Sequence, residues 1–207
     1  MKIRYIGHAC FEVSENGYSV IFDPYEPNNV PGTLSISEEA NDVCCSHEHG
    51  DHNYRAGVKL KAVEKAPIKI TEVSSYHDSE GGVVRGTNTI HVVDTESGLR
   101  AVHMGDIGHV LEAGQRDLLG NPDVVMIPVG GFYTVDAKQA KAIAENLGAR
   151  VIIPMHYRGE GFGYDVIGTV QEFTSLFPED MVKFYDTDTI EVTKDTPPQV
   201  AVLKFKR

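Results

Sequence analysis

The densest group of chemistry-bearing side chains is the segment 46–52 (SHEHGDH), which holds four potential metal ligands, namely His47, His49, Asp51 and His52. The pattern H-x-H-x-D-H is expected by chance in roughly one sequence of this composition per thousand. Imidazole nitrogens and carboxylate oxygens without thiolates suit zinc, manganese or iron, and a wholly polar ligand set leaves coordination positions open for water. The segment therefore predicts a metal centre that can do chemistry.

Three further candidate ligands, His77, Asp106 and His156, occur later in the chain. Each of them terminates an apolar run, as the segment 46–52 does. Taken alone, a histidine or aspartate in such a position is more often an ordinary core or surface residue than a ligand. Their shared place at the ends of expected strands is what connects them.

The elements that must position these side chains begin with short β-prone runs. Asn16-Gly17 is a strong hairpin signal between two of these runs, and Ser97-Gly98 provides a turn between two later ones. The strands expected in this part of the chain cover residues 2–6, 10–13, 18–22, 42–46, 87–93 and 99–104.

The later part of the chain alternates strands with helices. Residues 124–129 form a continuous apolar strand, 136–147 carry their apolar side chains on one helical face, and 151–153 form the next buried strand. This order predicts a βαβ unit with a parallel strand pair and a right-handed crossover. The remaining expected elements are a helix over 166–177 and strands over 182–185, 189–192 and 200–205.

Length and composition fit one globular domain over residues 1–207. The chain is 41% hydrophobic and 24% charged, which excludes disorder, collagen-like repeats and a disulfide scaffold. No solenoid repeat, low-complexity stretch or linker divides it. Meanders followed by a βαβ unit and late helices predict an α/β fold of two mixed β-sheets with helices outside, in four layers.

The charge and the N-terminal residues limit the partners that we expect. Nineteen Lys and Arg against 30 Asp and Glu give a net charge of −11, which opposes binding to nucleic acid. Residues 1–8 lack the apolar core of a signal peptide, and no apolar run approaches the length of a membrane span. We therefore expect a cytoplasmic protein with a small-molecule substrate and no nucleic-acid or membrane partner. The sequence leaves the oligomeric state open, a homo-oligomer included.

Taken in order along the chain, these residues resemble the metallo-β-lactamase superfamily, with Asp23 in the stretch 20–24 (VIFDP) preceding the segment 46–52. The stretches GHACF, PVGGFYT and IPMHY, at 7–11, 128–134 and 153–157, look more narrowly like the small metal-dependent hydrolases grouped with the ascorbate-6-phosphate lactonases. The resemblance implies an αββα sandwich of two mixed β-sheets.

Carried over residue by residue, the resemblance implies a binuclear site with two divalent ions, zinc first and manganese or iron as alternatives. Asp23 would accept the second N–H of a ligand histidine and so fix its tautomer. The implied ligands are His47, His49 and His77 for one ion, Asp51, His52 and His156 for the other, and Asp106 as the bridge between them.

Two such ions, about 3.5 to 4 Å apart, can bind a hydroxide near neutral pH and polarise a carbonyl or phosphoryl oxygen. Asp51 would hold and orient this nucleophile. His8, in the GHACF stretch, is expected near the metals as a substrate contact or proton donor, with a structural role as the alternative. Tyr133, Tyr157 and Arg158 follow strand ends and are candidate substrate contacts, Arg158 through a carboxylate or phosphate.

The function predicted from these residues is metal-dependent hydrolysis of a small ester-like substrate, compatible with an anionic one. Lactones, thioesters and phosphodiesters are the substrate classes expected, in that order. One alternative is an iron-dependent redox enzyme on the same fold, although diiron relatives place Glu where this chain has His49. The other alternative is a noncatalytic metal-binding protein.

Overall fold

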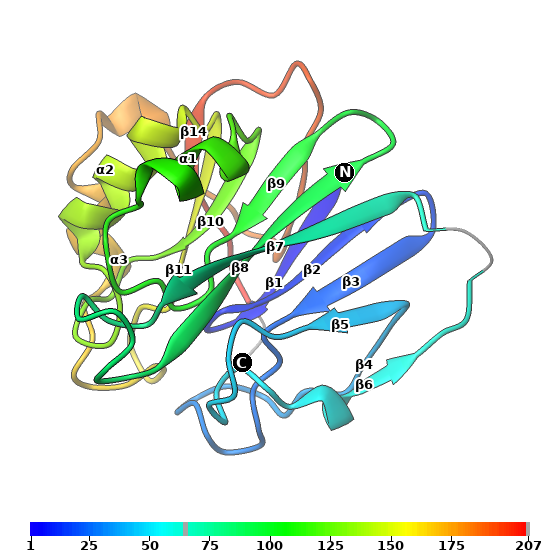
Figure 1. The fold of residues 1–207 in the computed structure, drawn as a ribbon, viewed down its shortest axis with the longest axis horizontal. Helices are drawn as coiled ribbons and strands as arrows, with labels where there is room; N and C mark the ends of the chain where they lie inside the picture. The colour runs from blue at the N-terminus through cyan, green and yellow to red at the C-terminus, as the bar shows by residue number, and fades with distance from the viewer. Residues whose placement is uncertain (64–65, 206–207) are drawn as a thin grey trace.

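The computed structural model describes residues 1–63 and 66–205, and its framework is a pair of mixed β-sheets packed against each other (Figure 1). The N-terminal sheet is antiparallel except for its last pair, in which β3 runs parallel to β5. Its order is β13 (Thr189–Glu191), β1 (Lys2–Gly7), β2 (Cys10–Glu15), β3 (Tyr18–Phe22) and β5 (Asp42–Cys44).

The second sheet has seven strands. Its first five strands run parallel to one another, and the last two are added antiparallel, so that β9 belongs to both parts. The predicted parallel pair is confirmed, because Val124 lies opposite Val151 in the β10–β11 ladder. The order of the sheet is β12 (Val182–Phe184), β14 (Gln199–Val202), β11 (Val151–Met155), β10 (Val124–Pro128), β9 (Arg100–His103), β8 (Thr87–Thr95) and β7 (Ile68–Tyr76).

Three helices, α1 (Ala113–Leu119), α2 (Ala137–Leu147) and α3 (Val170–Thr174), lie on the side of the second sheet that faces away from the N-terminal sheet (Figure 1). The longest of them, α2, begins where Asp136 accepts a hydrogen bond from the backbone N–H of Gln139 and ends at Gly148, which has a φ of +64°. None of the helices within the described ranges has the length and apolar character that crossing a bilayer requires.

The outer face of the N-terminal sheet is covered differently. The covering layer consists of the segment 24–37, the short 3-10 helix η1 (Arg55–Gly57), and a small parallel sheet of β4 (Glu38–Ala40) and β6 (Val58–Leu60). A second hydrophobic cluster lies beneath it, formed by Cys10, Ile21, Tyr25, Val30, Ile36, Ala40 and Val58. The predicted α/β fold of two mixed β-sheets is confirmed, but on this face the described residues form coil, two short strands and one 3-10 turn where the prediction places outer helices.

Some elements differ from the sequence prediction. The helix expected over 166–177 shrinks to α3, because the preceding chain instead bonds to neighbouring loops, as when Gly168 N donates to Gly130 O. The strand expected over 200–205 ends at Val202. The prediction missed α1 and the edge strand β7, whose sequence IKITEVSSY mixes apolar and charged residues and leaves most side chains exposed or half-buried.

Gly105 is a position where the backbone itself sets the site, because it directly precedes Asp106 and has a φ of +54°. A Cβ there would lie 2.3 Å from Asn88 Oδ1 and 2.5 Å from Ser46 Cβ. We expect Gly105→Ala to cost more than about 2 kcal/mol of unfolding free energy and to displace Asp106. Gly148→Ala is the matched control, since its φ is +64° and a Cβ there meets nothing within 4 Å. Equal losses in urea denaturation for the two variants would contradict this account.

Candidate metal centre

Side chains that follow six strands converge on one edge of the sandwich, where both sheets end. The loops that supply them are short, so that the strand ends themselves position the site. His8 follows β1, Asp23 follows β3, the segment 46–52 follows β5, His77 follows β7, Asp106 follows β9 and His156 follows β11.

One group consists of His47, His49 and His77, whose ligand atoms all lie within 4.8 Å of one another. The ring centroid of His47 is 4.6 Å from that of His49 and 4.7 Å from that of His77. These are the three residues that the resemblance assigns to one metal ion, and the structure brings them together.

A second group consists of Asp51, His52 and His156, joined by His8, again with ligand atoms within 4.8 Å of one another. His8 Nε2 lies 3.2 Å from Asp51 Oδ2, and the His8 ring centroid is 4.1 Å from that of His156. The structure thus gathers the residues assigned to the second ion and places the buried His8 beside them.

Asp106 lies between the two groups. Its Oδ2 atom is 3.2 Å from the Nε2 atoms of His52, His77 and His156. Its backbone N–H donates to Asn88 Oδ1 at 2.8 Å, which fixes the turn that presents the carboxylate. A carboxylate in contact with both groups has the position that the bridging role requires.

The buried donor atoms of this cluster fit a metal. Asp106 Oδ1, His8 Nδ1, His47 Nε2 and His156 Nδ1 are buried without a hydrogen-bond partner in the described part of the chain, and the Nε2 atoms of His52 and His156 have the 3.2 Å contact with Asp106 Oδ2 instead of a regular hydrogen bond. Buried polar atoms nearly always have a partner, because desolvation without one costs about 1 to 3 kcal/mol. Converging unpartnered imidazole and carboxylate atoms are the donors that divalent transition metals prefer.

A hydrogen-bonded chain behind the cluster fixes which nitrogens face it. Asp23, fully buried, accepts from Ser46 N at 2.6 Å, from Ser46 Oγ at 2.6 Å and from His52 Nδ1 at 2.8 Å. Since the Ser46 hydroxyl donates to Asp23, it accepts from His47 Nδ1 at 2.9 Å. Both histidines are therefore protonated at Nδ1 on the side away from the cluster and present Nε2 to it, which is the contact expected of Asp23.

Burial and charge set the protonation of the cluster. Burial lowers the pKa of His8 and His47 to about 4. Burial opposes ionisation of Asp106 as well, but the adjacent His156 and His52 hold the pKa of its carboxyl well below the usual range. For His52, the carboxylates of Asp106, Asp51 and Asp23 outweigh desolvation and raise the pKa. His8 and His47 are therefore neutral beside ionised carboxylates, which is the state that binds metal, and metal binding at His52 would release the proton that the carboxylates hold there.

A cavity of about 310 Å³ opens onto the cluster. Of the three predicted substrate contacts, Tyr133 lines this cavity. Two residues that the sequence prediction missed line it too, Arg85 from the β7–β8 loop and Tyr164 from the loop after β11. Burial and the nearby Asp51 raise the pKa of Tyr164, whose hydroxyl donates to Asn29 Oδ1 at 2.8 Å.

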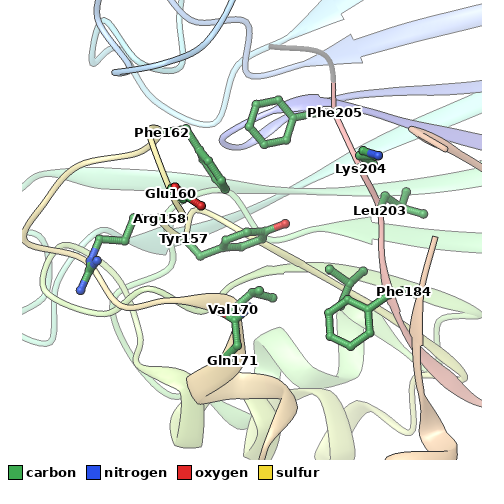
Figure 2. Close-up of a pocket in the computed structure, with 12 residues that line it drawn as sticks. Tyr157, Arg158, Glu160, Phe162, Val170, Gln171, Phe184, Leu203, Lys204 and Phe205 are labelled. Carbon is green, nitrogen blue, oxygen red and sulfur yellow. The ribbon is translucent and has the colours of Figure 1, made fainter. Parts of the chain in front are cut away.

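The structure does not bring Tyr157 and Arg158 to this cavity, which corrects their expected place. They line a separate hollow of about 500 Å³ beside β12 and β14, where the Arg158 side chain points away from the Tyr157 ring (Figure 2). The backbone turns at His156, with a φ of +53°, so the next side chains leave the metal-facing edge. Arg158 Nε then donates to Ile167 O at 2.7 Å.

Comparisons with known proteins agree with this geometry. Residues 2–156 match the family model of the beta-lactamase superfamily domain. The chain therefore belongs to the metallo-β-lactamase superfamily.

Within that superfamily the chain is similar to proteins named UPF0173 metal-dependent hydrolases. The one from Methanopyrus kandleri is 30% identical over 76% of this chain and 84% of the relative. The one from Hyperthermus butylicus is 28% identical over 75% of this chain and 82% of the relative. A solved structure from Thermotoga maritima, described as a candidate Zn-dependent hydrolase of the metallo-beta-lactamase superfamily, is 31% identical, with a TM-score of 0.79 over 99% of each chain. These relatives place the protein in the class of metal-dependent hydrolases.

The buried neutral histidines predict a pH dependence of stability. Burial lowers the pKa of His8, His47 and His91 to about 4, whereas histidine in an unfolded chain has a pKa near 6.5. Between these values the unfolded state binds more protons, so the free energy of unfolding of the metal-free protein falls as pH drops from 6.5 to 4. Each such histidine contributes at most about 1.4 kcal/mol per pH unit.

Urea denaturation of chelator-treated protein from pH 7.5 to 4.5 measures this slope. The His91→Gln variant should reduce the slope, because one buried titrating histidine is lost. His91 lies outside the ligand cluster and packs against Phe22 with a ring-centroid distance of 5.4 Å, so the substitution leaves the candidate ligands in place. A slope of zero across this range would contradict the protonation states given above.

Proposed function

We propose that the protein is a binuclear metal hydrolase that cleaves a small ester-like substrate, with lactones the preferred class. The observation that carries this proposal is the contact of the Asp106 carboxylate with histidines of both ligand groups, at 3.2 Å from each of three Nε2 atoms. Two adjacent ligand groups that share one carboxylate fit two ions rather than one. Zinc suits this donor set best, and manganese or iron is compatible with it.

In this proposal His47, His49 and His77 would hold one ion, Asp51, His52 and His156 would hold the other, and Asp106 would be the ligand common to both. The bound metals would supply Lewis acidity and a nucleophilic hydroxide at neutral pH. Asp51, on the cavity wall, orients the attacking oxygen. Asp23 and Ser46 hold His52 and His47 in the tautomers that leave Nε2 free.

His8 acts beside Asp51 in this proposal. The ring is buried, and its Nε2–H donates to Asp51 Oδ2 at 3.2 Å, which limits the rotation of that carboxylate. The same imidazole lies within reach of the second ligand group, where it would form a hydrogen bond to the substrate.

The cavity and the charge limit the substrate to a small molecule. A cavity of about 310 Å³ is at the lower end of the range for small-molecule sites. The net charge of −11 opposes a polyanionic substrate such as RNA. A small anionic substrate remains compatible, since bound cations reverse the local field.

Removal of one ligand tests the proposal directly. We expect His49→Ala to lower metal-dependent hydrolysis of a lactone, thioester and phosphodiester panel by at least roughly a hundredfold while the chain stays folded. Glu48→Gln is the matched control from the same loop, because the Glu48 side chain is exposed and pairs with Arg55 instead of facing the cluster.

Full turnover by His49→Ala, or turnover that survives chelation in the parent protein, would refute the binuclear mechanism. Turnover that consumes dioxygen or a reductant would favour the iron-dependent redox alternative. Metal binding without turnover of any panel member would favour the noncatalytic one.

The role of His8 has its own test. We expect His8→Gln to lower kcat at least roughly tenfold with the metal content unchanged, because the variant loses the imidazole that holds Asp51 beside the second ligand group. Steady-state kinetics with elemental analysis of the same sample gives both quantities. An unchanged kcat would assign His8 a purely structural role.

A further inference from the structure

Arg85 is a cationic side chain at the mouth of the metal cavity. It lies in the loop between β7 and β8, is half-buried, and lines the cavity together with His49 and His77. Its guanidinium carbon is 5.8 Å from the centroid of the Tyr133 ring, which lines the same cavity. A guanidinium over an aromatic face is attracted to the ring, and its N–H groups stay available to another partner.

The guanidinium of Arg85 differs from those of three other partly buried arginines. Within residues 1–63 and 66–205 it has no carboxylate at ion-pair distance, whereas each of the following arginines has one: Arg4 with Glu12 and Glu38, Arg100 with Asp94, and Arg150 with Asp123. Arg116 and Arg158 also lack a carboxylate at ion-pair distance among the described residues, but the guanidinium of each donates to a backbone carbonyl. A half-buried cation without a counter-ion, facing a cavity, is suited to an anionic ligand.

The loop that carries Arg85 is fixed to the ligand cluster. Asp78, the residue after the candidate ligand His77, is buried and accepts hydrogen bonds from four backbone N–H groups of this loop. The donors are Glu80 at 2.8 Å, Gly82 at 2.9 Å, Val84 at 3.0 Å and Arg85 at 2.7 Å. Arg85 is thereby held at a set position relative to His77, as recognition of one part of a substrate requires.

We propose that Arg85 is the specificity-determining residue of the site and binds a carboxylate or phosphate group of the substrate that is not the bond being cleaved. Tyr133 lies beside the guanidinium, and the Tyr164 ring, whose centroid is 6.0 Å from that of Tyr133, lines the same cavity. This inference rests on the proposed hydrolase function and narrows its substrate class to small lactones or esters with a second, negatively charged group.

A matched substrate pair tests this inference, namely γ-butyrolactone and the same ring with a carboxylate at C5. We expect Arg85→Gln to raise KM for the carboxylated lactone at least roughly tenfold, since a hydrogen-bonded charge pair is lost, with kcat changed less than about twofold. The kinetics of the neutral lactone should not change. Arg85→Lys should restore part of the affinity, because the charge returns without the planar fork.

Lys69→Gln is the charge-matched control. Lys69 is exposed near the start of β7, about 25 Å along the extended strand from His77. Its removal changes the net charge as Arg85→Gln does, so an equal KM effect would assign the result to net charge and overturn the proposal. An Arg85→Gln effect of the same size on both lactones would overturn it as well.

A binding measurement separates this inference from the proposed function. Calorimetric titration of the metal-loaded protein with inorganic phosphate, and separately with acetate, should show binding that weakens at least roughly tenfold in Arg85→Gln. The anion that binds more tightly identifies the recognised group. If the parent protein cleaves neither lactone, the proposed substrate class fails while this titration still tests Arg85. Affinities unchanged in Arg85→Gln for both anions would overturn the role of Arg85.

Discussion

The Asp106 carboxylate is buried among the Nε2 atoms of His52, His77 and His156, and the rest of the site is arranged around this contact. A buried carboxylate is stable only where cations or hydrogen-bond donors replace its hydration. Here the neighbouring imidazoles supply that compensation, and a metal would supply more of it. Asn88 fixes the Asp106 backbone, and the tight packing around Gly105 leaves the turn no room to shift. The two sheets therefore meet at an edge whose geometry is set by charge as much as by packing.

The backbone carries strain at the same edge. His8, Asp23 and His156 have φ values of +54°, +47° and +53°, a left-handed conformation that costs a non-glycine residue of order 1 to 3 kcal/mol. Each of them lies directly beyond a strand end. The side chains of His8 and His156 enter the cluster, and that of Asp23 supports it from behind through Ser46 and His52. The apolar core between the sheets, built from residues such as Phe11, Val92 and Met126, supplies the stability that keeps these turns in place.

How much could be predicted from the sequence depended on how local each signal was. The segment 46–52 concentrates four donors after one strand, so its metal-binding chemistry could be predicted without knowledge of the fold. The roles of His77, Asp106 and His156 could be predicted only from the resemblance to a family. Side-chain direction was not readable. A left-handed residue at His156 reverses the alternation of a strand, so Tyr157 faces another hollow while Tyr164, further along the loop, returns to the cavity. No sequence motif marked Arg85 as a cavity residue. It lies at the cavity only because Asp78 hydrogen-bonds the backbone of its loop and holds that loop beside the cluster.

The central claim is that one edge of this sandwich holds two metal ions through the two ligand groups that Asp106 joins. Elemental analysis of the purified protein, with the chain concentration measured on the same sample, tests it most directly. The account predicts two transition-metal ions per chain, zinc foremost, and at most one in a variant that lacks His49. No bound metal after reconstitution with zinc, manganese or iron, or one ion whose binding does not depend on these residues, would contradict it.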